Sequence, residues 1–303
     1  MTGRRLGAGP RSRGGPRRAT VDGMTYDLGY FGPDSVTWRL HSDPVLWVGG
    51  LRALFLQALH PLAMAGIEQH SGFRDDPWGR LFRTADYVGV ITYGTRAEAD
   101  RAAARVRGRH RRHTGIEPES GMRYDVDDPA LLMWVHCCEV DSFLSTARRA
   151  GMRLSAADAD RYVAEQVRSA RLVGIPAELA PRTVADLEAY FERMRPELRL
   201  TAAARSAARF VLLPPMPVAV RLATPARPVW VGVSLLAFSL LPRWARRLYR
   251  LPGLPVTDLT ASLALRWMRT AVRTLPAGLR EGPHYRQAKV RLAETPVRRL
   301  DVV

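Results

Sequence analysis

From Ser35 onward, apolar residues recur at intervals of three and four, which is the spacing of one face of an α-helix. Residues that alternate between apolar and polar, as in a half-buried strand, form no convincing run, and no internal repeat is present. The pattern predicts an all-α, single multi-helix domain over about residues 24–280. The expected helices lie near residues 44–70, 77–92, 96–112, 129–150, 156–173, 183–194, 201–212, 229–250 and 257–274.

The ends of these helices carry recognisable capping residues. Asp76-Pro77 and Asp128-Pro129 each place a capping acid before a proline at the first helical position. Capping boxes are expected at Thr95–Glu98 and, in weaker form, at Ser155–Asp158 and Thr183–Asp186. Glycines that can end the preceding helices stand at Gly94, Gly115, Gly151 and Gly174. Pro61 is expected to kink the first long helix.

Both ends of the chain are basic. Residues 1–23 are rich in Gly, Pro and Arg with no apolar segment behind them, so they are neither a complete secretory signal nor a membrane anchor, and we expect a disordered arm. Residues 281–303 are expected to form a basic tail. Cys137 and Cys138 are the only cysteines, and adjacent cysteines rarely form an unstrained disulfide. A reducing, cytoplasmic location is therefore expected.

The chain has a formal net charge of +17, and Lys289 is the only lysine among its 46 basic residues. Arginine keeps its charge at any physiological pH, which favours an acidic partner: nucleic acid, an anionic membrane or an anionic cofactor. The most apolar stretch, residues 229–241, is shorter than the roughly 20 residues needed to cross a bilayer. It is expected to be a buried core helix or, with the basic RWARRLYR segment behind it, a peripheral membrane contact.

The segment VRGRHRRHTG, residues 106–115, places histidines among arginines. On a helix over 96–112, His110 shares a face with alanines, and the arginines gather mostly on the other side. A small-residue face admits either a flat ligand or a closely packed helix. His110 is therefore a candidate metal ligand or a core histidine. The face consists of Ala99, Ala102, Ala103 and Val106, one turn before His110.

Two further helices carry candidate polar groups. Arg80 and Thr84 lie four residues apart on one face, where a guanidinium and a hydroxyl suit a carboxylate ligand, although a surface position is an alternative. His136 and Asp141 interrupt an otherwise apolar helix, and buried polar groups need partners. His136 is a candidate ligand contact or a structural hydrogen-bonding residue.

Several other chemistries lack their sequence patterns. The only Glu-x-x-His spacing, Glu281 to His284, contains Gly-Pro and so does not suit a helical di-iron site. No zinc-binding spacing, phosphate-binding loop, dinucleotide fingerprint or Gly-x-Ser-x-Gly elbow occurs.

Over roughly residues 30–250 the chain resembles the MpaB-type oxygenase family. The resemblance rests on three segments in this order: WGRLFRTADYV, AARVRGRHRRHTG and DDPALLMWVHCCEVDSF. That family includes the rubber-cleaving latex-clearing proteins. The resemblance implies an all-α fold that encloses a b-type haem, with the iron held by a helical histidine. Matched by motif, His110 is the expected axial (metal) ligand, with His113 as a close alternative. Arg80 and Thr84 are expected near the haem as catalytic and cofactor-binding residues, and Arg83 and His136 as further cofactor contacts.

The chain also departs from the rubber oxygenases. Where they can carry a lysine as second axial ligand, this sequence has Arg83, which cannot readily lose its proton. The glutamate proposed as a base in rubber cleavage has no secure match, since Glu68 has a different spacing. These differences disfavour rubber as the substrate.

We therefore expect a haem b-dependent oxygenase or peroxidase-like oxidoreductase that acts on a small apolar metabolite with O2 or peroxide. A non-catalytic haem-binding or anionic-surface-binding protein is the alternative. Nucleic-acid binding through the basic segments is less favoured, because a nucleic-acid helix would present polar or aromatic residues among its arginines. The sequence does not define the oligomeric state.

Overall fold

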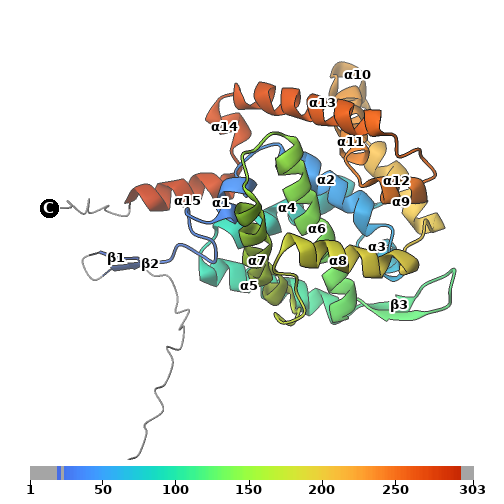
Figure 1. Cartoon of the computed structure of the whole chain (residues 1–303), viewed down its shortest axis with the longest axis horizontal. Helices are drawn as coiled ribbons and strands as arrows, with labels where there is room; N and C mark the ends of the chain where they lie inside the picture. Colours follow the sequence, from blue (N-terminus) through green and yellow to red (C-terminus); the bar gives the residue numbers. More distant parts are fainter. Residues whose placement is uncertain (1–18, 22–23, 295–303) are drawn as a thin grey trace, which may run out of the picture.

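The computed structural model describes residues 19–21 and 24–294, and it shows the expected all-α domain (Figure 1). Residues 1–18, 22–23 and 295–303 lie outside the described part. The predicted disordered arm therefore falls outside it as well, except for one short strand.

In chain order the described elements are β1 (Ala19–Val21), β2 (Met24–Tyr26), α1 (Val36–His41), α2 (Leu46–Gln57), α3 (Pro61–His70), α4 (Pro77–Tyr93), α5 (Arg96–His110), β3 (Thr114–Ile116), β4 (Arg123–Asp125), α6 (Pro129–Arg149), α7 (Ala156–Val173), α8 (Val184–Met194), the 3-10 turn η1 (Arg195–Glu197), α9 (Ala202–Leu212), α10 (Val218–Ala223), α11 (Ala226–Ser239), α12 (Arg243–Leu248), α13 (Pro255–Arg273), α14 (Ala277–Arg280) and α15 (Pro283–Glu294).

The predicted helix starts are confirmed. The Asp76 carboxylate accepts from the Gly79 amide at 2.9 Å, and Asp128 accepts from the Ala130 amide at 2.8 Å. All three expected capping boxes are formed, at the starts of α5, α7 and α8. Each capping side chain accepts a hydrogen bond from an amide that the first helical turn leaves unpaired. Since the side chain and the amide are close in sequence, the capping residues predict the helix starts correctly.

Two predicted long helices are each divided. The expected helix at 44–70 is α2 and α3, whose axes differ by 108°. His60 is extended and caps α3 with its ring nitrogen, and Pro61 occupies the first turn of a new helix. Proline at that position suits a helix start, so it separates two helices here instead of kinking one. The expected helix at 229–250 is likewise divided before Pro242 into α11 and α12.

Two antiparallel ribbons and a C-terminal helix were not expected. β1 pairs with β2, and β3 pairs with β4 with Gly115 opposite Tyr124. Gly115 does not end α5; an added Cβ there would lie 2.5 Å from the Tyr124 hydroxyl, so the glycine admits that ring. Residues 283–294 of the expected basic tail form α15, which packs against α4.

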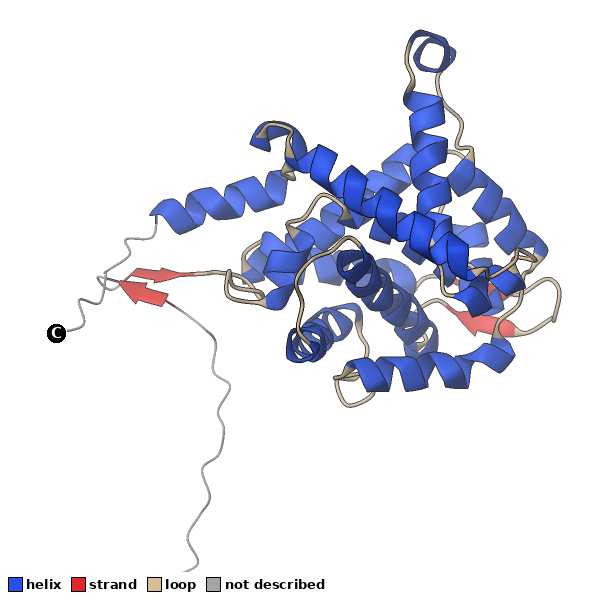
Figure 2. Ribbon diagram, turned by 45° about the horizontal axis from the view of Figure 1, so that its top comes forward, coloured by secondary structure: helices blue, strands red, loops and turns tan. Residues whose placement is uncertain are grey.

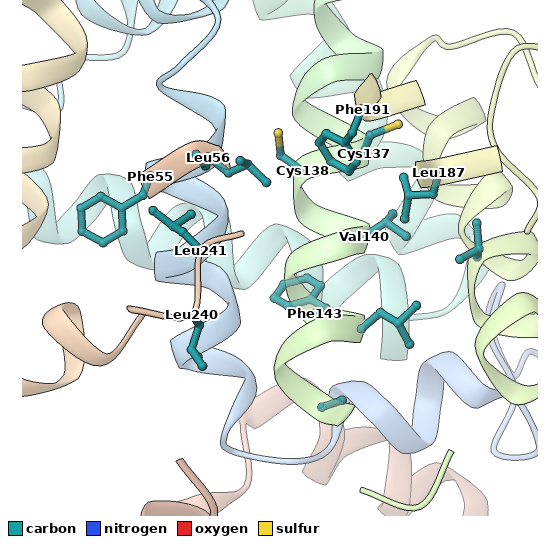
Figure 3. Packing of buried hydrophobic residues seen from close by; sticks show 14 of the residues in the cluster. Phe55, Leu56, Cys137, Cys138, Val140, Phe143, Leu187, Phe191, Leu240 and Leu241 are labelled. Atoms are coloured by element: carbon teal, nitrogen blue, oxygen red, sulfur yellow. The ribbon is translucent and has the colours of Figure 1, made fainter. Parts of the chain in front are cut away.

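The core is built around α2 and α6 (Figure 3). At Gly49 an added Cβ would meet the Phe143 ring at 3.0 Å, so glycine allows the two helices to approach closely. Arg52, also on α2, is buried and pairs with Asp141 of α6 at 2.8 Å. This pair supplies the partner that a polar residue on α6 was expected to need. The labelled side chains of Figure 3 are Phe55, Leu56, Cys137, Cys138, Val140, Phe143, Leu187, Phe191, Leu240 and Leu241.

Helices α10, α13 and α14 lie along one side of the domain, with α5, α8 and the β3–β4 ribbon on the other side (Figure 1). Figure 2 shows that the described strands are short and that helices form nearly all of the domain. α13 packs on α11 and α6. Within the described residues, only the bent α2–α3 pair has the length and composition of a bilayer span, and no single helix does.

Candidate functional site

Three neighbouring cavities lie along α4. The largest has a volume of about 470 Å³ and is bounded mainly by α2, α4, α6 and the segment before α15. A cavity of about 90 Å³ between α4, α5, α6 and α7 shares four lining residues with it, and a third of about 120 Å³ shares five. The residues common to the first two are His41, Val88, Thr92 and Glu139. The first and third have Leu51, Leu54, Gln57, Leu81 and Thr84 in common.

His110 is the last residue of α5 and lines the cavity of about 90 Å³. Its Nδ1 atom is buried and has no hydrogen-bond partner among the described residues. Burial lowers the pKa of the imidazole, and the charge of Arg80 lowers it further, whereas Asp127 raises it. The ring is therefore held in its neutral form, the form in which a histidine can bind a metal.

Arg80 and Thr84 lie one turn apart on α4, as the sequence indicates. The Arg80 guanidinium donates a hydrogen bond to the Thr84 hydroxyl, which donates in turn to the Arg80 carbonyl at 2.9 Å. Burial lowers the pKa of Arg80, followed by the charges of Arg83 and Arg109. No carboxylate of the described chain pairs with Arg80. A partly desolvated guanidinium of this kind is suited to an anionic ligand.

His136 lines the same cavity as His110, from α6. Burial lowers the pKa of His136 to about 4, so this imidazole is also neutral. His41 lies between this cavity and the largest one, where it makes 3.0 Å hydrogen bonds with Thr92 and Tyr162. These bonds fix the orientation of the His41 ring, whereas no described residue hydrogen-bonds to the His136 ring.

Sequence reasoning missed two polar residues at these cavities. Tyr87, with a buried and unpartnered hydroxyl, lines the cavity of His110 and lies three residues beyond Thr84 on the same face of α4. Glu139 lies three residues beyond His136 on α6 and faces both cavities. Burial raises the pKa of Glu139 to about 7. Helical spacing from the residues already identified was the available signal for both.

Two of the predicted site residues lie outside these cavities. Arg83 is exposed and pairs with Asp76 at 2.9 Å. His113 stacks on His70 with ring centroids 4.5 Å apart, between α3 and the β3–β4 ribbon. Glu68 pairs with Arg74 and lines none of the cavities. The structure thus gathers Arg80, Thr84, His110 and His136 around adjoining cavities, and Arg83 and His113 do not line them.

The helix expected near 96–112 is α5, which ends two residues earlier, at His110, so no further helical turn follows that histidine. Of the two alternatives for the alanine face, the structure shows the closely packed helix, because Ala99 and Ala103 pack with Phe31, Ile91 and Leu172. The small side chains allow α5 to pack tightly against α4 and α7, and only the end of the helix reaches the cavity.

The residues present fit a b-type haem. Around the cavities lie a neutral histidine with an unpartnered buried nitrogen, an arginine without a carboxylate, and mainly apolar walls. No group of three or more His, Cys, Asp or Glu side chains within the described ranges could hold a metal ion. A haem iron does not require such a group, because one axial histidine can hold it.

These features define a helical protein with adjoining, mostly apolar cavities and a neutral histidine at the wall of one of them. Residues 38–274 match the family described as the catalytic domain of the ER-bound oxygenase mpaB/B′ and rubber oxygenase, so the chain belongs to that oxygenase family. No curated protein and no solved structure matches the chain significantly. The family resemblance expected from the sequence is thereby confirmed, and membership supports an enzymatic function of the oxygenase class.

Proposed function

We propose that the protein is a haem b-dependent oxygenase, or a peroxidase-like oxidoreductase, that oxidises a small apolar molecule with O2 or peroxide. The observation that carries this proposal is the buried, unpartnered Nδ1 of His110, because a buried polar atom without a partner is unfavourable unless a ligand satisfies it.

The polar residues around the cavities have separate roles in this proposal. His110 would hold the iron, and its lowered pKa keeps the ring nitrogen free of a proton. Arg80 and Thr84 would bind a carboxylate of the macrocycle, since the guanidinium and the hydroxyl are already joined by a hydrogen bond. Haem b, when bound, supplies an iron at which O2 or peroxide can be activated.

The largest cavity supports an apolar substrate. Four leucines, Val88 and five Trp, Phe or Tyr rings line it, together with several polar side chains, and Trp47 and Phe82 meet edge to face with ring centroids 6.3 Å apart. Apolar walls exclude water and orient a ligand by shape. Glu139 is positioned to hold or release one proton near neutral pH, which suits the acid–base step of an oxidation.

An absorption spectrum of the purified protein, recorded with and without dithionite, tests the proposal. We expect a Soret band in the protein expressed with ample haem and a shift of that band on reduction. A colourless protein would contradict the proposal. Stoichiometric haem without turnover of O2 or peroxide would instead support the non-catalytic haem-binding alternative.

A further inference from the structure

Helix α13 is apolar on two faces. Ala261 and Leu265 are buried on the side toward the core. The outward side carries a second apolar row at spacings of three and four residues, in which Trp267 is 75% and Leu259 is 62% exposed. This row consists of Val256, Leu259, Leu263 and Trp267. Core packing does not account for it, because no part of the described chain covers it.

The exposed row continues onto neighbouring helices. Leu279 on α14 is 76% exposed and Leu222 on α10 is 77% exposed. Residues 274–276 join α14 to α13, and α10 packs on α11, which packs on α13. Figure 1 shows α10, α13 and α14 along one side of the domain. We call this surface the α13 face, defined by Val218, Leu222, Val229, Val256, Leu259, Leu263, Trp267, Leu275 and Leu279. An exposed apolar surface of several helices normally marks an interaction site.

The α13 face is surrounded by positive charge. Residues 198–280 contain thirteen arginines and a single acid, Asp258. The Asp258 carboxylate is engaged by Arg243 at 2.7 Å and by Arg246 at 2.6 Å. The exposed side chains of Arg221, Arg227 and Arg273 pair with no carboxylate within the described part of the chain. The partner of this face is therefore expected to be both apolar and anionic.

We propose that the α13 face docks the protein on the surface of an anionic lipid bilayer. Apolar side chains and a tryptophan would enter the boundary between headgroups and acyl chains, while the arginines would contact the anionic headgroups. Aliphatic side chains do not suit a nucleic acid, which binds through stacking and phosphate contacts. The excess of positive charge over residues 198–280 fits an anionic lipid surface better than it fits a second copy of this equally basic face.

The docking face borders the largest cavity. Arg269 of α13 pairs with Asp43 at 2.7 Å, and Asp43 and Arg280 both line that cavity. An apolar substrate dissolved in the bilayer would therefore meet the cavity close to the docking surface. This consequence rests on the proposed function, whereas the membrane docking is independent of the proposed function.

Co-sedimentation with vesicles tests the docking. Vesicles of phosphatidylcholine alone are compared with vesicles that contain one third phosphatidylglycerol, at low and high salt. We expect binding to the anionic vesicles that weakens with salt. The double variant Leu259→Ser/Trp267→Ser should bind at least about tenfold more weakly, because two side chains lose their apolar contact with lipid. The triple variant Arg221→Gln/Arg227→Gln/Arg273→Gln should lose the preference for anionic vesicles.

The matched control is Ile116→Ser/Leu179→Ser, which changes two apolar residues that are 61% and 62% exposed and lie outside the α13 face. This control should bind as the unchanged protein does. Circular dichroism shows whether each variant is folded, and gel filtration shows whether a dimer forms through the α13 face. Absence of vesicle binding, equal binding by all variants, or a dimer that Leu259→Ser/Trp267→Ser dissociates would overturn the proposal. Vesicle binding is measured independently of the haem spectrum, so the two proposals fail separately.

Discussion

His110 and His136 line one cavity of about 90 Å³ from two different helices, α5 and α6, and both imidazoles are held neutral by burial. Neither ring has a hydrogen-bond partner among the described residues, but only the His110 Nδ1 is completely buried, whereas the His136 side chain is partly exposed. The two histidines therefore offer unequal sites for an iron, and substitutions can separate them.

His110→Ala is expected to abolish haem binding, because it removes the imidazole that we assign to the iron. His113→Ala is the matched control and should leave the Soret band nearly unchanged, since His113 stacks on His70 away from the cavities. Absorption spectra of both variants provide the measurement. The reverse result would move the iron to His113, and retention of haem by both variants would point to His136.

Arg80→Met should weaken haem binding by roughly tenfold or more, because a charge-assisted hydrogen bond to a carboxylate is lost. Arg83→Gln serves as the control, since Arg83 is exposed and paired with Asp76. Haem titration followed at the Soret band gives both affinities. Equal losses in the two variants would show that Arg83 contacts the cofactor after all.

Glu139→Gln should change how stability depends on pH. The folded protein holds the carboxyl pKa at about 7, above the ordinary value of 4.5, so the folded state binds the proton more tightly than the unfolded state does. Stability is therefore lost as pH rises from about 4.5 to 7, by up to roughly 3 kcal/mol. Gln cannot ionise, and the variant should gain this amount relative to the unchanged protein between pH 5 and pH 8.

Urea unfolding at the two pH values measures that difference. Glu178→Gln, at an exposed position, is the control and should show no such gain. The stability difference between Glu139→Gln and the unchanged protein could instead be the same at both pH values. That result would mean that the Glu139 carboxyl is ionised at a solvated site.

Arg52→Met should destabilise the fold by about 3–5 kcal/mol, as expected when one partner of a buried ion pair is removed. Its guanidinium donates to Ser142 at 2.6 Å and to the Leu240 carbonyl at 3.0 Å, as well as pairing with Asp141. Denaturant unfolding measures the loss. Arg39→Ala removes an exposed ion pair with Asp158 and should cost less than about 1 kcal/mol. Similar losses in both variants would argue against a structural role for the buried pair.

The sequence was sufficient where a feature depends on neighbouring residues. Helix starts were predicted because the capping side chain and its amide lie within three residues of each other. The placement of Arg80 near His110 was also accessible, because α4 and α5 are joined by only Gly94 and Thr95, and a short connection makes successive helices neighbours.

Features that depend on contacts between segments far apart in the chain could not be predicted from the sequence. The alanine face of α5 is covered by Leu172 of α7 and by Phe31, which lie far away in sequence. Sequence spacing could not distinguish these residues from a flat ligand. Glu139 was overlooked because its significance comes from two cavities whose walls are formed by several helices.

The 108° corner between α2 and α3 also limits how the chain can vary in length. α2 lines the largest cavity and packs mainly on α6, whereas α3 packs on the β3–β4 ribbon, and both helices contact α9. Each helix must therefore present a particular face to its own neighbours. Each residue of a helix turns its face by about 100°. Removing one residue between Gln57 and Pro61 would therefore turn a different face of α3 toward its neighbours, even if the remaining residues were equally apolar. Leu59, His60 and Pro61 are themselves buried and the His60 ring caps α3, so the corner depends on the number of its residues as well as on their identity.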